Sequence, residues 1–208
     1  MLIHPWDAAG DGEALAFVRA QQFGTLIAAG RGRDVPVVVP TQFLLIDDVI
    51  DEVTVLLHLA RPNPVWRAIE ENPAVVLSVA GDWSYVPAAW KAIGDEDPAL
   101  GIPTTYYAAV QLVGEATVLD GPDDKLDLLR RQLGDLEPGS GVADPETHRR
   151  LLKGIRGLRL AVRELRGKFK YGGNADAGHR LAVAGRLAER DGPGDAAARE
   201  HLLRRTGR

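Results

Sequence analysis

The chain has 208 residues, no cysteine and a formal net charge of −4, with hydrophobic residues at 45% and charged residues at 26%. This composition is typical of a globular protein with one sizeable core, and the missing cysteines exclude disulfides, thiolate catalysis, iron–sulfur clusters and cysteine zinc sites. No apolar run reaches the roughly 20 residues of a membrane span, and the N-terminus lacks the basic segment of a secretory signal, so we expect a cytoplasmic protein.

The first half of the chain predicts one helix, then strands with a second helix among them. Residues 13–20 have helical spacing. Asn63 is a typical N-cap with Pro64 at the first helical position, and this helix should end near Asn72. The predicted strands share β-branched and aliphatic residues between turn signals: 25–29, 36–45, 53–59 and 74–80.

The second half predicts a long loop, a long strand and more helices. Residues 81–103 read as an irregular segment, and a loop of this length in a compact domain is more often functional than idle. The further elements follow in order: a strand at 106–119, helices at 123–133 and 144–152, alternating strands at 158–165 and 167–171, and Ala/Leu/Arg-rich helix broken at 191–194. About six strands without a βαβ rhythm predict an α+β barrel.

His58 and Arg61 stand where an apolar strand ends. His58 is either a histidine hydrogen-bonded to backbone or a cofactor ligand, and the neighbouring Arg61 favours the second reading because arginine suits bidentate anions. Met1 is the single methionine, so a bound haem would have His or Tyr as its axial ligand. No pair of histidines has the spacing of a metal site.

A second polar cluster contains Lys168, Lys170 and Asn174. The two lysines share one face of a strand, where they either form a solvated edge or contact an anion across a subunit interface. Tyr106 and Tyr107 begin the longest strand, so one ring should point inward and the other outward. Core packing is the simpler role for either ring.

Five segments together resemble the PaiB family of FMN-binding negative transcriptional regulators. They occur in family order: His58–Trp66, Tyr85–Trp90, Ile102–Thr104 leading into Tyr107–Val110, Gly154–Gly157, and Gly167–Lys170 with Asn174. The resemblance implies a homodimeric, six-stranded split β-barrel of the flavin-reductase and pyridoxamine-oxidase kind, with peripheral helices and a cofactor cleft between subunits. We expect residues 1–170 to form this domain and residues 171–208 a C-terminal helical extension.

Departures from the family pattern point to one branch. Thr105, Gly172-Gly173 and Ala80 replace an aromatic, a Ser-Gln pair and a histidine of the family. The chain is similar to the piperazate synthases in its strand Pro103–Gln111 and in its Gly-rich replacement of the flavin segment. These enzymes use haem b to close N5-hydroxyornithine into piperazic acid by forming an N–N bond. The resemblance implies these roles: His58 as axial iron ligand, Arg61, Asn63, Trp66 and Lys170 as further cofactor-binding residues, and Tyr106, Tyr107 and Lys168 as catalytic residues.

Three alternatives stay open. The first is an FMN-binding oxidoreductase-like protein with Arg61, Lys168 and Lys170 on the phosphate. The second is a negative transcriptional regulator that binds DNA or a protein through the basic tail, where residues 166–208 carry ten Lys/Arg against five Asp/Glu. The overall acidic chain argues against nucleic acid. The third is a haem-handling protein without catalysis.

Overall fold

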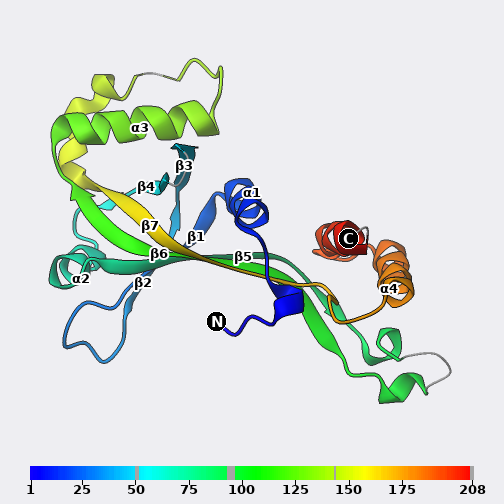
Figure 1. The fold of residues 1–208 in the computed structure, drawn as a ribbon. Coiled ribbons are helices and arrows are strands. Elements are labelled where there is room, and N and C mark those ends of the chain that lie inside the picture. The colour runs from blue at the N-terminus through cyan, green and yellow to red at the C-terminus, as the bar shows by residue number, and fades with distance from the viewer. Residues whose placement is uncertain (50–51, 93–96, 143, 207–208) are drawn as a thin grey trace. The chain divides into compact units, whose positions relative to one another are not determined.

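A computed structural model describes residues 1–49, 52–92, 97–142 and 144–206 (Figure 1). Within these residues, seven strands form one sheet in the order β2-β1-β5-β6-β7-β4-β3. The strands are β1 (Phe23–Ala28), β2 (Val37–Gln42), β3 (Leu44–Val49), β4 (Glu52–Ala60), β5 (Ala74–Val86), β6 (Thr104–Leu119) and β7 (Ile155–Lys170). The pairs β1/β2, β1/β5, β3/β4 and β4/β7 are antiparallel. The predicted α+β class with a split-barrel sheet and peripheral helices is confirmed, with seven strands instead of six.

The helices are α1 (Asp11–Gln21), α2 (Val65–Glu71), α3 (Pro122–Leu136), α4 (Ala177–Arg190) and α5 (Asp195–Thr206), with short 3₁₀ helices η1 (Pro5–Asp7), η2 (Ala88–Trp90), η3 (Pro98–Leu100) and η4 (Pro145–Gly154). Among the described residues, none of these helices has the length and apolarity to cross a membrane.

The chain divides into two compact units. Unit 1 contains Met1–Glu13, Ala80–Val110 and Gly167–Arg208, and unit 2 contains Ala14–Val79 and Gln111–Arg166. Strands β5, β6 and β7 have residues in both units. The predicted boundary at residue 170 stays a prediction, although α4 and α5 belong to the same unit as the N-terminal residues.

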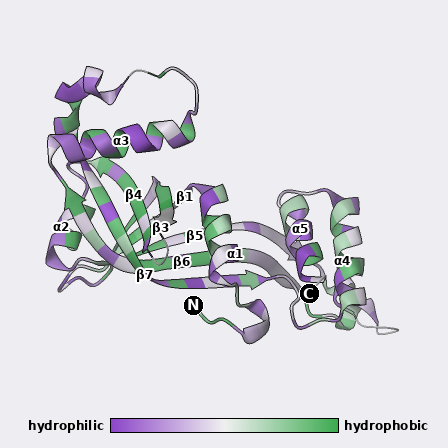
Figure 2. Cartoon of the chain, turned by 45° about the horizontal axis from the view of Figure 1, so that its top comes forward, coloured by the Kyte–Doolittle hydropathy of each residue, from purple (hydrophilic) through white to green (hydrophobic). Residues whose placement is uncertain are grey.

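Unit 2 is built on strands with an apolar inner face. Strand β1 alternates along its length, and Leu26 and Ala28 are fully buried. Leu77 from β5, Leu158 and Leu160 from β7 are equally inaccessible. Figure 2 shows both apolar and polar residues along these strands, with polar bands on β7. Burial of this alternating face is what fixes the register of the strands.

Unit 1 encloses an aromatic core. Phe169 and Tyr171, at the end of β7, are fully buried, as are Val183 and Leu187 on α4. The Tyr171 hydroxyl donates to the carbonyl of Asp82 at 2.8 Å. Helices α4 and α5 pack together, so the predicted break at 191–194 forms the turn of a helical hairpin.

A tight turn and an ion pair hold this hairpin. Gly194 has φ +80, and a Cβ built there would lie 2.0 Å from the Trp83 carbonyl oxygen. Asp195, 1% exposed, accepts hydrogen bonds from Arg190 at 2.6 Å and from the Ser84 hydroxyl at 2.6 Å. The turn therefore requires glycine, both for its left-handed backbone and for its close approach to β5.

Several predicted elements differ from the structure, among them the strands predicted at 158–165 and 167–171, which are the single strand β7. The predicted strand at 36–45 is two strands, because it breaks at the buried Phe43. Strand β5 continues to Val86, beyond the predicted end at residue 80, because alternation resumes after Asp82, which has φ +51. Helix α2 begins at Val65, with Asn63 Oδ1 accepting from the Val65 N–H. The helix predicted at 144–152 is the 3₁₀ helix η4, which has non-helical angles at His148.

Candidate functional site

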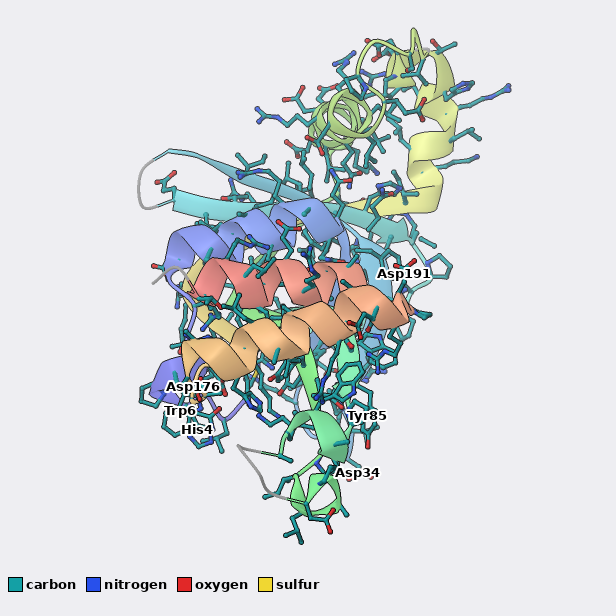
Figure 3. All side chains as sticks on the ribbon, turned by 90° about the vertical axis from the view of Figure 1, so that its right-hand side faces the viewer. His4, Trp6, Asp34, Tyr85, Asp176 and Asp191 are labelled. Carbon is teal, nitrogen blue, oxygen red and sulfur yellow. The ribbon has the colours of Figure 1, made fainter. Side chains whose placement is uncertain are left out.

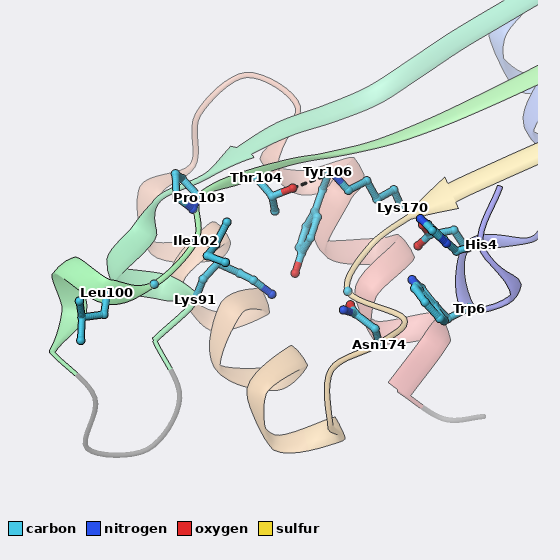
Figure 4. A pocket seen from close by; sticks show the side chains of 13 residues that line it. His4, Trp6, Lys91, Leu100, Ile102, Pro103, Thr104, Tyr106, Lys170 and Asn174 are labelled. Carbon is cyan, nitrogen blue, oxygen red and sulfur yellow. Dashed lines mark hydrogen bonds between the residues drawn. The ribbon is translucent and has the colours of Figure 1, made fainter. Parts of the chain in front are cut away.

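A cavity with a volume of about 570 Å³ lies in unit 1 (Figure 4). We name it the Tyr106 cavity. Its walls come from segments far apart in sequence: His4, Trp6, Asp7, Lys91, Leu100–Thr104, Tyr106, Lys170, Gly172 and Asn174. Its volume is that of a small-molecule or cofactor site.

Tyr106 places a hydroxyl in this cavity. The alternation of β6 buries the ring, which is 1% exposed, and burial raises the pKa of Tyr106 to about 12. Within the part of the chain that the structure describes, its hydroxyl oxygen has no hydrogen-bond partner. A buried hydroxyl without a partner is costly, and one that stays protonated at neutral pH can donate to a ligand.

Gly172 leaves the space that this hydroxyl occupies. Its φ is +68, and a Cβ built there would lie 2.7 Å from the Tyr106 hydroxyl oxygen. Any L-residue at this position would strain the backbone and push the hydroxyl away. The glycine and the tyrosine together shape this wall of the cavity.

Charged side chains determine the electrostatics of the cavity. Lys91, Lys170 and Asp7 line it, and His179 lies beside the Lys91 amine. The Lys170 amine donates to Thr104 Oγ1 at 2.7 Å, and the Lys91 amine lies 3.5 Å from His179 Nε2. Burial, with help from the Lys170 charge, lowers the pKa of Lys91. Burial also raises the pKa of Asp7, against the opposing effect of nearby cations that include Lys168 and His4. The amines of Lys91 and Lys170 line the same cavity and favour an anionic ligand.

Aromatic rings form another wall. His4 and Trp6 stack with ring centroids 4.7 Å apart and planes 7° from parallel, and Figure 3 shows them side by side. Trp6 is 45% exposed, so its ring has a free surface. Such a surface suits a planar ligand.

The predicted metal ligand, His58, lies in unit 2. Its Nδ1 is 2.7 Å from Oε1 of Gln132, which is 5% exposed. With Gln132 accepting, Nδ1 carries the proton and Nε2 keeps its lone pair, the arrangement that supports metal-ligating histidines. His58 lines a mainly apolar cavity of about 300 Å³ with His148 and seven apolar neighbours: Leu129, Leu133, Val142, Pro145, Leu151, Leu152 and Ile155.

Arg61 has protein partners instead of an open anion site. It donates to both Asp120 oxygens, at 3.2 and 2.5 Å, and to the Lys153 carbonyl at 2.7 Å. Lys125, 3% exposed, adds bonds to Asp120 and to the Leu152 carbonyl. The Arg61 hydrogen bond holds the pKa of Asp120 below its usual value. We name Arg61, Asp120 and Lys125 the Asp120 cluster.

Asn63 and Trp66 serve the local fold in this structure. Asn63 accepts from the Val65 N–H, and the Trp66 indole donates to the Ala60 carbonyl at 2.9 Å. Trp66 is 3% exposed and lies under the Arg156 guanidinium. These contacts fix the connection from β4 to α2, and a cofactor role for either residue stays a prediction.

Unit 1 contains the predicted catalytic residues and the predicted cofactor-binding Lys170, but these residues form two groups. Tyr106 and Lys170 line the Tyr106 cavity. Lys168 instead donates to the Leu2 carbonyl at 3.0 Å and lies over the Tyr107 ring, 5.6 Å from its centroid. As predicted, Tyr106 points inward while Tyr107 stays half-exposed. Tyr107 and Lys168 lie outside the residues that line this cavity.

Sequence reasoning missed four cavity residues: His4, Trp6, Asp7 and Lys91. The signal available for Lys91 was its place in the long segment 81–103. In the described parts of the chain, no group of three or more His, Cys, Asp or Glu side chains could hold a metal ion. A haem iron needs only one protein ligand, so this finding leaves the His58 prediction open.

Comparison with known families gives a match over most of the chain. Residues 2–164 match the model of the family described as "Putative FMN-binding domain". The chain belongs to this FMN-binding family. A curated relative supports the assignment: the Protease synthase and sporulation protein PAI 2 of Bacillus subtilis (strain 168) is 24% identical over 182 residues, which are 85% of this chain and 84% of that protein. The resemblance to PaiB proteins is confirmed at this level, whereas the piperazate synthase branch stays a prediction.

Solved structures similar to this member of the FMN-binding family show the fold. The FAD and heme binding protein from Mycobacterium smegmatis has a TM-score of 0.60 at 18% identity, covering 80% of this chain and 74% of that one. The flavocytochrome Anf3 from Azotobacter vinelandii has a TM-score of 0.57 at 20% identity, covering 80% and 71%. At these identities the likeness concerns the fold alone.

Proposed function

We propose that this protein binds FMN in the Tyr106 cavity and acts as a PaiB-like, flavin-dependent oxidoreductase. The observation that carries the proposal is the Tyr106 hydroxyl, which has no hydrogen-bond partner among the described residues and lies in a cavity with two lysines and an exposed tryptophan ring. Membership of the FMN-binding family supports the choice of ligand.

The residues of the cavity fit the parts of FMN. Lys170, Lys91 and Thr104 would hold the phosphate, since amines and a hydroxyl are donors to phosphate oxygens. Tyr106 would donate to a polar edge of the ligand, and Trp6 offers a face to a planar ring. When bound, FMN supplies hydride and electron transfer, and the chain supplies binding and orientation.

Titration of flavin-free protein with FMN tests this proposal through the quenching of flavin fluorescence. Lys170→Ala should weaken binding about tenfold or more, because it removes a charge-assisted contact of about 1.5–3 kcal/mol. Lys168→Ala is the matched control, since Lys168 is a strand neighbour outside the cavity. Equal affinities of the two variants would contradict this placement of the phosphate.

We propose further that the protein is a homodimer, as the family resemblance implies. A regulator that binds DNA is a weaker alternative, because several tail arginines already have acidic partners. Arg190 pairs with Asp195, Arg204 with Glu200, and Arg205 with Glu13. Light scattering measures the dimer, and a salt series with duplex DNA measures phosphate binding.

A second candidate function is haem-dependent cyclisation of N5-hydroxyornithine to piperazic acid. His58 favours it, because Gln132 sets its tautomer and the adjoining cavity is apolar. If haem binds here, His58 would hold the iron, and the apolar side chains of the adjoining cavity would contact the porphyrin. Haem iron, when bound, supplies Lewis-acid chemistry. The roles predicted for Tyr106, Tyr107 and Lys168 with the substrate belong to this candidate.

Absorption spectroscopy separates the two candidates. A two-banded yellow spectrum supports FMN, and a single intense Soret band supports haem. If haem binds, His58→Ala should abolish or shift the Soret band, and Gln132→Leu should shift it less. A native band in His58→Ala would remove His58 from the axial role. Turnover of N5-hydroxyornithine then separates the cyclase from a haem-handling protein.

A further inference from the structure

We propose that Lys91 is a nucleophilic amine, which forms an imine in the Tyr106 cavity with small aldehydes that carry an anionic group. This inference goes beyond FMN binding and does not depend on it. It rests on the surroundings of the amine, on the groups across the cavity and on the chemistry that they permit together.

The Lys91 amine faces an imidazole and another cation. Its Nζ lies 3.5 Å from His179 Nε2, and in the described part of the chain it makes no ion pair with a carboxylate. Burial and the Lys170 charge both disfavour its ammonium form. Burial and Lys91 likewise lower the pKa of His179. A desolvated lysine beside another cation is the usual origin of a reactive amine, and a neutral imidazole beside it can accept a proton.

The other walls of the cavity supply the anion site. The Lys170 amine donates to Thr104 Oγ1 at 2.7 Å. Tyr106 directs its hydroxyl, which has no partner among the residues that the structure describes, into the same space as the Lys91 amine (Figure 4). The remaining titratable groups on the cavity wall are His4 and Asp7. Burial raises the pKa of Asp7, and the charges of Lys168, His4 and Lys170 oppose this shift.

Imine formation balances without any oxidant or reductant. The neutral Lys91 amine adds to the aldehyde carbon, and the carbinolamine that forms loses water. One C=N bond replaces the C=O bond, the carbonyl oxygen leaves in the water, and both amine protons leave with it. His179 can take up and return a proton during these steps, and Tyr106 can donate a hydrogen bond to the developing oxyanion.

The test uses pyridoxal 5′-phosphate as the aldehyde, followed by borohydride reduction and peptide mapping of flavin-free, full-length protein. Lys91 should be labelled at least about tenfold faster than the exposed Lys153 near neutral pH, as expected for a lowered pKa. Lys91→Arg should remove this label and keep the labelling of other lysines. Equal rates at Lys91 and Lys153 in the wild-type protein would overturn the proposal, whether or not the variant folds.

A second arm tests the anion site. Pyridoxal without the phosphate should label Lys91 more slowly than pyridoxal 5′-phosphate. Near neutral pH, Lys170→Gln should lower the ratio of the labelling rate with pyridoxal 5′-phosphate to that with pyridoxal, because any change in the reactivity of Lys91 itself affects both aldehydes alike and cancels in this ratio. Equal slowing of both aldehydes would overturn the role of Lys170 as the anion anchor. The FMN titration is a separate measurement, so either proposal can fail alone.

Discussion

The Asp120 cluster and the Tyr106 cavity both collect cations near the end of a strand, but among the described residues only the first pairs them with a carboxylate. Arg61 and Lys125 share the carboxylate of Asp120 and reach backbone carbonyls. Lys91 and Lys170 line a cavity, together with a hydroxyl that has no partner among the described residues. Polar groups that the protein satisfies itself contribute to stability, and polar groups left unsatisfied are available to a ligand.

The largest effect on stability is expected from Lys125→Ala. This change leaves the Leu152 carbonyl and part of Asp120 without a buried donor, so the free energy of unfolding should fall by about 2–3 kcal/mol. Urea denaturation measures it. The exposed Lys153→Ala is the control, with an expected change below about 0.5 kcal/mol. Similar losses of unfolding free energy in both variants would show that Lys125 in the Asp120 cluster contributes no more to stability than an exposed lysine.

The ion pair between Arg190 and Asp195 tests, within unit 1, whether a charged group with a protein partner contributes to stability. Arg190 holds the pKa of Asp195 at about 2, below its ordinary 3.8. Because the folded pKa is the lower one, the stabilisation is present above the unfolded pKa and is lost as pH falls through about 2. We expect Asp195→Asn to lower the free energy of unfolding at neutral pH on the order of 1–2 kcal/mol, with the difference shrinking below about pH 4. A difference that does not change with pH would contradict this.

A smaller effect is expected from Arg61→Ala. The pair with Asp120 is partly exposed, at 44% and 40% of the two side chains, so its loss should cost about 1 kcal/mol of unfolding free energy. FMN binding should stay unchanged, because Arg61 is already occupied. A tenfold or greater loss of FMN affinity would instead restore Arg61 as a phosphate-binding residue.

The smallest change in stability is expected from Tyr106→Phe. Removing a buried hydroxyl that has no partner in the described part of the chain should leave the unfolding free energy within about 1 kcal/mol of the wild type, on the stabilising side. FMN affinity should nevertheless fall by about fivefold to tenfold, the loss of one neutral hydrogen bond. Parallel unfolding and flavin titrations measure both. A destabilised variant with unchanged FMN affinity would show that the hydroxyl stabilises the fold and does not bind FMN.

The fold was largely predictable because alternation and turn residues act locally. The long strand at 106–119 and the helix at 13–20 follow from periodicity, and β6 and α1 confirm them. The extension of β5 to Val86 was not predictable, since Asp82 interrupts the alternation with a left-handed residue that only the structure reveals.

The candidate site was predictable only in part. Alternation predicted that one of Tyr106 and Tyr107 would point inward. The polar cluster at 168–174 contained two residues that line the cavity, Lys170 and Asn174. Trp6 and Lys91 join them through tertiary contacts that no local pattern encodes. The pairing of Arg61 with Asp120 spans 59 positions, so the sequence could not show that this arginine was already engaged.

The turn at Gly194 has a consequence for how the chain can be cut. A sequence of Asp, Gly and Pro between two helices is a typical site of proteolytic nicking. Here the Gly194 backbone lies against the Trp83 carbonyl, and the Arg190 guanidinium is bound to Asp195, so a protease cannot draw this segment into its extended binding cleft. We expect trypsin to cleave after the exposed Arg31, in the turn between β1 and β2, before it cleaves the helical hairpin.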